Sequence, residues 1–330
     1  MEESKARRLL VDTGKQLLKT ALVARTWGNI SCRLDSETIV ITPSGLDYMK
    51  TREEDIVKMN IATGEWQGIH KPSGERGVHI AAYQVFSDVN FVIHTHQTYA
   101  SALGLAGFDN LDITEEEKET LGGITLAEYG LPGTKKLTNA VKEALLAGAK
   151  VVLMKNHGVL ICGSDQEETM RKAILLEDIC KRNIKGNFEA IQEEMPGNVE
   201  KLLSMIKAKF PYTALVQTPA VVACANRGIP IYAQLDDMAQ MIGRKIPLVS
   251  DNEVIHALEK TNAVLVQGMG AIVRSESEDD TKALEILVDK AAVCSIHTAE
   301  CNMKSRISII DAVLMKFVYK MKYSKQKNRV

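Results

Sequence analysis

Two histidines that follow a short apolar run are the residues with the clearest potential for metal chemistry. Residues 90–96 read N-F-V-I-H-T-H, and the apolar start of this segment predicts a buried strand. Side chains alternate faces along a strand, so His94 and His96 should leave one face and Thr95 the other. Two imidazoles on one face form half of a metal site, and a chance pairing of two histidines is the alternative.

A third histidine completes a candidate ligand set. Residues 151–157 read V-V-L-M-K-N-H, so His157 also follows a predicted buried strand. Binding sites in α/β sheets gather at the carboxyl ends of strands. By itself, His157 is better explained as a hydrogen-bonded structural histidine. Together with His94 and His96 it predicts three protein ligands and one open position, which is the composition of a catalytic zinc site.

Three loops combine glycine with serine or asparagine. They read G-N-I-S at Gly28–Ser31, T-P-S-G at Thr42–Gly45 and P-S-G-E at Pro72–Glu75. Glycine lets backbone N–H groups come close to a bound anion, so such loops can wrap a phosphate. Each loop taken alone is more typical of a plain turn.

Composition and charge narrow the class of protein. The chain has 330 residues, of which 45% are hydrophobic and 25% are charged, and this length is enough for two domains. The net charge of −1 favours neither a nucleic acid nor a membrane as a partner. The sequence predicts neither a transmembrane helix nor a signal peptide. The six cysteines form no C-x-x-C pair, so we expect reduced thiols in a cytoplasmic protein.

Hydrophobic periodicity predicts helices that alternate with short strands in the first half of the chain. The predicted helices are 5–24, 77–86, 98–105, 141–147 and 166–185, and the predicted strands are 27–33, 38–42, 55–59, 66–69, 90–96 and 151–157. This order suits an α/β fold in which antiparallel strands carry helices on their flanks. The basic tail 316–329 is expected to be the solvated end of a helix, with a role in closing an active site as the alternative.

The second half of the chain repeats the first weakly. Residues 263–273 align with residues 151–161, and the helical patterns that follow these two segments also match. Further upstream, residues 213–228 align with residues 92–107. Self-similarity of this kind predicts a tandem duplication.

The aligned second half lacks the candidate metal ligands. At the positions of the three histidines it carries Leu215, Gln217 and Met269. We therefore expect residues 1–190 to form the catalytic domain and residues 191–330 to form a degenerate copy of it. Gly, Glu, Gln and Pro cluster in residues 186–198, where a linker is predicted.

The polar motifs occur in a characteristic order along the chain. G-N-I-S, T-P-S-G, P-S-G-E, H-T-H and finally N-H-G at Asn156–Gly158 resemble the motifs of the class II aldolase/adducin family, which includes L-fuculose-phosphate aldolase. The resemblance covers residues 5–185 and is faint over residues 210–300. It implies a three-layer α/β/α domain with a mainly antiparallel central sheet, assembled as a four-fold ring. It also implies a zinc ion, with another divalent metal as the alternative, and a phosphorylated sugar substrate.

The resemblance also implies residue roles. His94, His96 and His157 match the metal ligands. Glu75 matches a carboxylate that binds the metal at rest and then moves off to act as acid or base. Tyr129 matches a tyrosine that reaches a neighbouring subunit's site and protonates the leaving fragment. The residues implied in substrate binding are Gly28, Asn29, Ser44, Gly45, Ser73 and Gly74, although Gly74 replaces a serine that helps to hold phosphate in the aldolase.

The resemblance implies a lyase, a zinc-dependent class II aldolase that cleaves a phosphorylated ketose to dihydroxyacetone phosphate and an aldehyde. Glu75 favours this chemistry or a decarboxylation over the family's 4-epimerases, which carry aspartate there. Trp27, where small residues are common, and Gly74 both depart from the aldolase pattern. A metal-dependent decarboxylase or dehydratase of a related sugar phosphate is the catalytic alternative. A non-catalytic, adducin-like binding module is the other, against which the three intact histidines argue.

The predicted duplication bears on assembly. Two chains, each with one live and one degenerate domain, would build a pseudo-four-fold dimer. A tetramer ringed by the live domains alone is the alternative, in which Tyr129 would act on a neighbouring chain. Either arrangement makes the protein a homo-oligomer.

Overall fold

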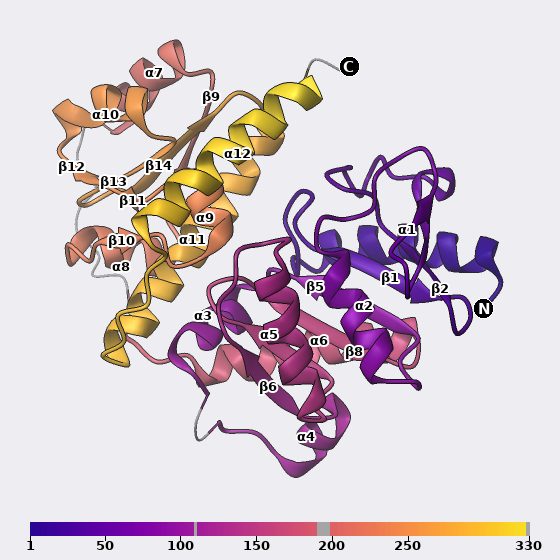
Figure 1. The fold of residues 1–330 in the computed structure, drawn as a ribbon. Helices are drawn as coiled ribbons and strands as arrows, with labels where there is room; N and C mark the ends of the chain where they lie inside the picture. The colour runs from indigo at the N-terminus through magenta and orange to yellow at the C-terminus, as the bar shows by residue number, and fades with distance from the viewer. Residues whose placement is uncertain (109–110, 190–198, 328–330) are drawn as a thin grey trace. The chain divides into compact units, whose positions relative to one another are not determined.

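The computed structural model describes residues 1–108, 111–189 and 199–327 (Figure 1). The chain divides into two compact units, Met1–Asn183 and Ile184–Val330, and each is described by itself. The predicted boundary between residues 190 and 191 lies outside the described residues, as does most of the predicted linker.

The first unit is built on an eight-stranded sheet with the order β4-β3-β2-β1-β5-β8-β7-β6. Its strands are β1 (Asn29–Arg33), β2 (Thr38–Ile41), β3 (Val57–Asn60), β4 (Trp66–Gln67), β5 (Phe91–Thr95), β6 (Ile124–Ala127), β7 (Val151–Met154) and β8 (Val159–Gly163). The sheet is mixed, because β6 pairs parallel with β7 while the other neighbouring strands pair antiparallel. The sheet that was expected to be mainly antiparallel is therefore a mixed sheet, because of this one parallel pair. Helix α5 (Lys135–Leu146) is the crossover connection that a parallel pair requires.

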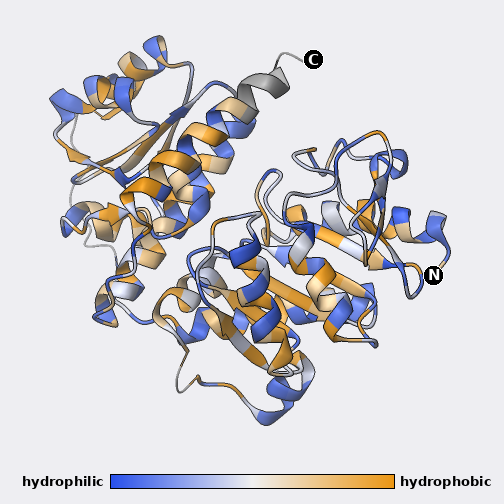
Figure 2. Ribbon diagram, viewed as in Figure 1, coloured by the Kyte–Doolittle hydropathy of each residue, from blue (hydrophilic) through white to orange (hydrophobic). Residues whose placement is uncertain are grey.

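Helices cover both faces of this sheet. The remaining helices of the unit are α1 (Glu3–Lys19), α2 (Arg76–Val85), α3 (Thr98–Ala106), α4 (Glu115–Leu121) and α6 (Gln166–Asn183). One apolar cluster joins α1, α3 and α6 to one face, and a second joins α2 and α5 to the other. Figure 2 shows hydrophobic residues concentrated in the central strands and hydrophilic ones on the surrounding helices. The predicted arrangement of two helical layers about one sheet is therefore found.

Strand β1 shows how period-two alternation sorts residues between the layers. Ile30 and Cys32 belong to the cluster beneath α1, α3 and α6. Asn29 and Ser31 alternate with them, so their side chains leave the face that α2 covers. Both polar residues are buried, which means that their hydrogen-bond partners must come from the protein.

Strand direction gathers the sequence motifs at one edge of the sheet. Strands β2, β5, β6 and β7 end at this edge, and β1 and β8 begin there, because of their parallel and antiparallel pairings. An isolated bridge between Pro43 and Pro72 ties the loop after β2 to the loop before α2. Loops far apart in the sequence therefore meet at this edge.

Some predicted boundaries are wrong. Helix α1 ends at Lys19 rather than near Ala24, and Ala21 has a left-handed backbone with φ of 57°. Helix α5 begins at Lys135, six residues before the predicted start at 141, because the hydroxyl of Thr134 caps it. Helix α4 and strand β6 were not predicted.

The second unit contains a four-stranded sheet with the order β12-β13-β14-β9. Its strands are β9 (Tyr212–Val216), β12 (Leu248–Val249), β13 (Ala263–Val266) and β14 (Gly270–Ser275), and a separate pair is formed by β10 (Ile231–Tyr232) and β11 (Lys245–Ile246). The helices are α7 (Val199–Lys209), α8 (Pro219–Asn226), α9 (Asp236–Met241), α10 (Val254–Lys260), α11 (Glu278–Glu300) and α12 (Ile309–Lys327). Strand β12 pairs parallel with β13, and the other two pairs are antiparallel. In the part of the chain that the structure describes, no helix is both long and apolar enough to span a membrane.

Candidate metal centre

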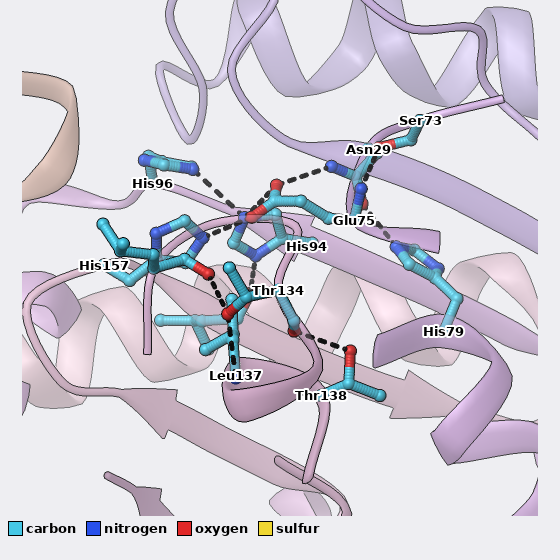
Figure 3. Close-up of polar contacts among 12 residues, drawn as sticks. Asn29, Ser73, Glu75, His79, His94, His96, Thr134, Leu137, Thr138 and His157 are labelled. Carbon is cyan, nitrogen blue, oxygen red and sulfur yellow. Dashed lines mark hydrogen bonds and ion pairs between the residues drawn. The ribbon is translucent and has the colours of Figure 1, made fainter. Parts of the chain in front are cut away.

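Three histidines and one glutamate converge at the edge of the first unit's sheet. His94 lies in β5, His96 follows that strand, and His157 lies in the turn between β7 and β8. Glu75 stands immediately before α2. One ligand atom from each of the four side chains lies within 4.8 Å of the others (Figure 3). Together they form a group of nitrogen and oxygen donors that could hold a metal ion.

The turn that carries His157 lies tightly against β5. Gly158 is required there, because a Cβ at this position would lie 2.3 Å from the carbonyl oxygen of Thr95. Asn156, two residues earlier, has a left-handed backbone with φ of 61°, which asparagine adopts more readily than most residues. The N-H-G motif therefore has a backbone reason: it lets the turn between β7 and β8 approach the end of β5.

A backbone contact sets the tautomer of His94. Its Nδ1 lies 2.8 Å from the carbonyl oxygen of Val159, so Nδ1 carries the hydrogen and donates it. The other ring nitrogen, Nε2, is left with a lone pair and lies 3.1 Å from Nε2 of His96. Donating the second ring N–H to a carbonyl is the usual arrangement of a metal-binding histidine.

Glu75 places one carboxylate oxygen against each of two histidines. Its Oε1 lies 2.7 Å from Nε2 of His157, and its Oε2 lies 3.2 Å from Nε2 of His94. Burial by itself raises the pKa of Glu75, but electrostatic interaction with His157 and then with His94, together with hydrogen bonds to the two rings, outweighs it and holds the pKa well below its usual value. The carboxylate is therefore ionised, although its side chain is only 15% exposed.

The donor set and spacing fit a divalent metal. Zinc binds imidazole nitrogen at 2.0–2.1 Å, so the ligand atoms of a tetrahedral site lie about 3.3 Å apart. Three of the separations, Glu75 to His157 at 2.7 Å, Glu75 to His94 at 3.2 Å and His94 to His96 at 3.1 Å, are close to this value, and the four ligand atoms all lie within 4.8 Å of one another. Three neutral imidazoles and one carboxylate are also donors that zinc accepts.

The loop before β1 lies directly beside the cluster. Asn29 pairs with His94 in the sheet, and its Nδ2 donates a hydrogen bond of 3.1 Å to Oε2 of Glu75. Gly28 has φ of 95°, and a Cβ there would lie 2.5 Å from the carbonyl oxygen of His94. Gly28 is thus needed for the close approach of this loop to β5.

The other predicted substrate-binding residues lie in two loops that are bonded to each other. The N–H of Ser44 donates to the carbonyl of Lys71, and the N–H of Ser73 donates to the carbonyl of Thr42. Ser73 is buried and its Oγ accepts a hydrogen bond from the N–H of Glu75, so this hydroxyl helps to shape the start of α2. Ser44, Gly45 and Gly74 are exposed, so solutes can reach this part of the edge.

Tyr129 follows β6, whose parallel pairing with β7 brings its end to the same edge of the sheet. Its side chain is partly exposed. The segment that follows lies close to the loop before α2, because a Cβ on Gly133 would lie 3.2 Å from the carbonyl oxygen of Gly74. Tyr129 is thus placed at the edge that carries the cluster.

A buried set of polar residues behind Glu75 was not predicted. His79 and Tyr83 lie on α2 and contact Asn29 and Ser31 on β1. The signal available in the sequence was spacing, since His79 and Tyr83 follow Glu75 by four and eight residues on one helix face. A histidine and a tyrosine on an amphipathic helix are also ordinary core residues, so the spacing alone did not single them out.

Comparison with known families decides the identity of the fold. The profile of the class II aldolase and adducin N-terminal domain matches residues 8–184, which is more than half of the chain. The chain belongs to the class II aldolase and adducin family. The predicted resemblance is therefore confirmed, and it covers the unit that holds the candidate metal ligands.

Curated relatives of this family include several activities. A 5-deoxy-D-ribulose 1-phosphate aldolase of Bacillus thuringiensis serovar kurstaki is 33% identical over 49% of this chain and 75% of its own length. A 3-oxo-tetronate 4-phosphate decarboxylase of Haemophilus influenzae is 28% identical over 55% of this chain and 88% of its own. The L-ribulose-5-phosphate 4-epimerase UlaF of Salmonella paratyphi C is 27% identical over 54% and 83%. Family membership alone therefore does not select one reaction.

A solved structure of L-fuculose 1-phosphate aldolase shares the fold of this chain. It is 30% identical, covers 64% of this chain and 99% of its own, and superimposes with a TM-score of 0.51. The first unit is thus a class II aldolase fold with a mixed central sheet.

We expect the purified protein to carry about one divalent metal ion per chain when it has never met a chelator. His94→Ala and His157→Ala should each abolish retention of the metal, because they remove one of three imidazole ligands. His256→Ala is the matched control and should retain it, since His256 is a largely exposed histidine of the second unit. Elemental analysis measures all four proteins. A content below about 0.3 ion per chain in the unsubstituted protein would contradict the site.

Proposed function

We propose that the protein is a metal-dependent class II aldolase that cleaves a phosphorylated ketose to dihydroxyacetone phosphate and an aldehyde. The observation that carries the proposal is the convergence of Glu75 with His94, His96 and His157 in a family of sugar-phosphate enzymes. Zinc is the proposed metal, because a His₃ set with a further oxygen ligand is typical of catalytic zinc sites. The proposed place of action is the cytoplasm.

A bound divalent metal would supply a positive charge that polarises the ketone of the substrate. His94, His96 and His157 would hold that metal. Cleavage of the bond between C3 and C4 then needs two proton transfers, one from the C4 hydroxyl and one to C3, which keeps the electron pair. Glu75 and Tyr129 are proposed for these transfers, Glu75 because it is an ionised carboxylate beside the metal ligands.

The substrate's phosphate is proposed to bind where the three glycine-containing loops meet. Ser44, Gly45 and Gly74 are exposed at this place. Backbone N–H groups beside glycines can reach a phosphate, and the loop around Gly28 and Asn29 leads from there to Glu75. This arrangement would hold the reacting carbons next to the metal and the carboxylate.

The second candidate function is decarboxylation of a phosphorylated sugar acid, with dehydration as a variant of it. It is supported by the relative that is a 3-oxo-tetronate 4-phosphate decarboxylase. Aldol cleavage and decarboxylation both leave an electron pair on a carbon next to a carbonyl, so the same metal and carboxylate could serve either reaction. A binding module without catalysis is disfavoured, because such a module does not need four clustered ligands.

Glu75→Gln should keep the metal, which three histidines still hold, and should lose at least about 10²-fold in turnover. The readout is release of dihydroxyacetone phosphate from a panel of phosphorylated ketoses, with carbon dioxide release from phosphorylated sugar acids in parallel. Glu116→Gln, an exposed carboxylate on α4, is the control and should be fully active. Full activity of Glu75→Gln would show that Glu75 only has a structural role, and carbon dioxide release alone would favour the second candidate.

We also propose that the second unit is a degenerate copy of the first. Its strand order β9-β14-β13-β12 has the same parallel and antiparallel pattern as β5-β8-β7-β6. The registers also correspond: His94 pairs with Leu160, and the aligned residues Leu215 and Ile272 pair with each other. The shared order, direction and register of the strands support this proposal.

The second unit has replaced each of the three histidine ligands. Leu215 lies in β9, Gln217 follows that strand, and Met269 lies in the turn between β13 and β14. The Nε2 of Gln217 donates a hydrogen bond of 3.0 Å to the carbonyl oxygen of Met269. The two positions that match His96 and His157 are thus joined through an amide, which supports a structural role for this unit.

The duplication leads us to propose a pseudo-four-fold dimer, in which two chains supply four domains of one type. In a closed ring, every domain contacts a neighbour on both sides, so no copy of the contact surface is left exposed. This favours the dimer over open association. Mass in solution, measured by light scattering, should equal two chains. A mass of four chains would contradict the dimer and would favour the ring of live domains in which Tyr129 acts on a neighbouring chain.

A further inference from the structure

A buried chain of hydrogen bonds leads from the last turn of helix α2 to the carboxylate of Glu75. Tyr83 Oη lies 2.8 Å from Ser31 Oγ, and Ser31 Oγ lies 2.7 Å from His79 Nδ1. His79 Nε2 contacts Oδ1 of Asn29, whose Nδ2 donates to Glu75. The four residues behind Glu75 are buried. Figure 3 shows Asn29 between His79 and Glu75, in contact with both.

Two different periodicities interlock to make this chain. Residues four apart on a helix are about 6 Å apart along its axis, and residues two apart on a strand are about 6.8 Å apart. Glu75, His79 and Tyr83 therefore alternate with Asn29 and Ser31 where α2 crosses β1. Each strand residue bridges two helix residues.

The hydrogen bonds all point in one direction. Burial first, and then electrostatic interaction with His94, lower the pKa of His79 to about 3, so His79 is neutral and carries one ring hydrogen. Asn29 gives its N–H to Glu75, so its Oδ1 must accept from Nε2 of His79. Nδ1 of His79 then accepts from the hydroxyl of Ser31, which in turn accepts from Tyr83.

We propose that His79 is a positioning residue for Glu75: by binding the amide oxygen of Asn29, it holds the amide nitrogen against the carboxylate of the metal centre. This inference rests on the proposed function, because it takes Glu75 as a ligand of the metal. Turning the Asn29 amide over would place its oxygen against the carboxylate of Glu75 and its nitrogen against the ring N–H of His79, so neither hydrogen bond could form. Residues that orient a metal ligand from behind typically change metal affinity or activity 10- to 100-fold.

A purely structural role would not require these residue types. Replacing both partners of a buried hydrogen bond by apolar groups of the same shape is close to neutral for stability. A helix crossing a strand could therefore be packed with apolar side chains, as α2 does elsewhere with Val78, Ala81 and Ala82. The buried polar residues of α2 are His79 and Tyr83, and both lie along the line that ends at Glu75.

The test is the affinity for zinc, measured without substrate by competition with a chelator of known affinity. His79→Phe should weaken zinc binding about tenfold. His79→Gln should recover most of the loss, because its amide can still donate to Asn29. In a Glu75→Ala background, His79→Phe should change the affinity less than about twofold, since no carboxylate remains to be positioned.

Tyr83→Phe keeps the inference testable if His79→Phe does not fold. It removes only the far hydroxyl and should weaken zinc binding about two- to threefold, again only when Glu75 is present. Tyr99→Phe is the matched control and should have no effect, because Tyr99 belongs to the same unit and packs against the apolar cluster on the opposite face of the sheet. Thermal unfolding of the metal-free proteins reports any structural cost separately.

Unchanged affinity in His79→Phe, or an equal loss with and without Glu75, would overturn the inference and leave the proposed function intact. Absence of zinc binding by the unsubstituted protein would overturn both. Because no substrate is present in the assay, a wrong assignment of the reaction would not affect this result.

Discussion

The first unit depends on keeping an ionised carboxylate and three imidazoles together in a place that water scarcely reaches. Removing these groups from water costs several kcal/mol per ion unless charges are matched and hydrogen bonds are made. Glu75 lies against His157 and His94, and a divalent cation between them would balance the carboxylate. The surrounding contacts supply the hydrogen bonds. The carbonyl of Val159 fixes His94, and Asn29 donates to Glu75.

The architecture of the sheet meets this requirement simply. His94 lies in β5, and His157 lies in the turn that follows β7. Strands β5 and β7 run in the same direction, because both pair antiparallel with β8, which lies between them. The loop before β1 reaches the same edge from the other side of β5. Glycine permits two close backbone approaches to β5, at Gly28 and Gly158. The sheet and its turns therefore position the three histidines, and the residue before α2 supplies the carboxylate.

The sequence could predict the parts of this arrangement that depend on local pattern. The strand before His94, the alternation that separates His94 from Thr95, and the helix after Glu75 follow from period and composition. It could not predict that β6 pairs parallel with β7, because strand partners are chosen by tertiary packing. The predicted end of α1 is also wrong, because the chain makes a left-handed turn at Ala21 and no glycine marks this turn in the sequence. The link from His79 to Glu75 through Asn29 needs two elements to be brought together, so neither element shows it alone.

The central claim is that three imidazoles and a carboxylate of the first unit surround one divalent metal. X-ray absorption spectroscopy of the zinc-loaded protein tests it most directly, because the spectrum reports the number and type of atoms bound to zinc. The account predicts a shell of nitrogen and oxygen at about 2.0–2.2 Å with the outer scattering of three imidazoles. His94→Ala should lose that signal. Sulfur at about 2.3 Å, or fewer than three imidazoles, would contradict the account.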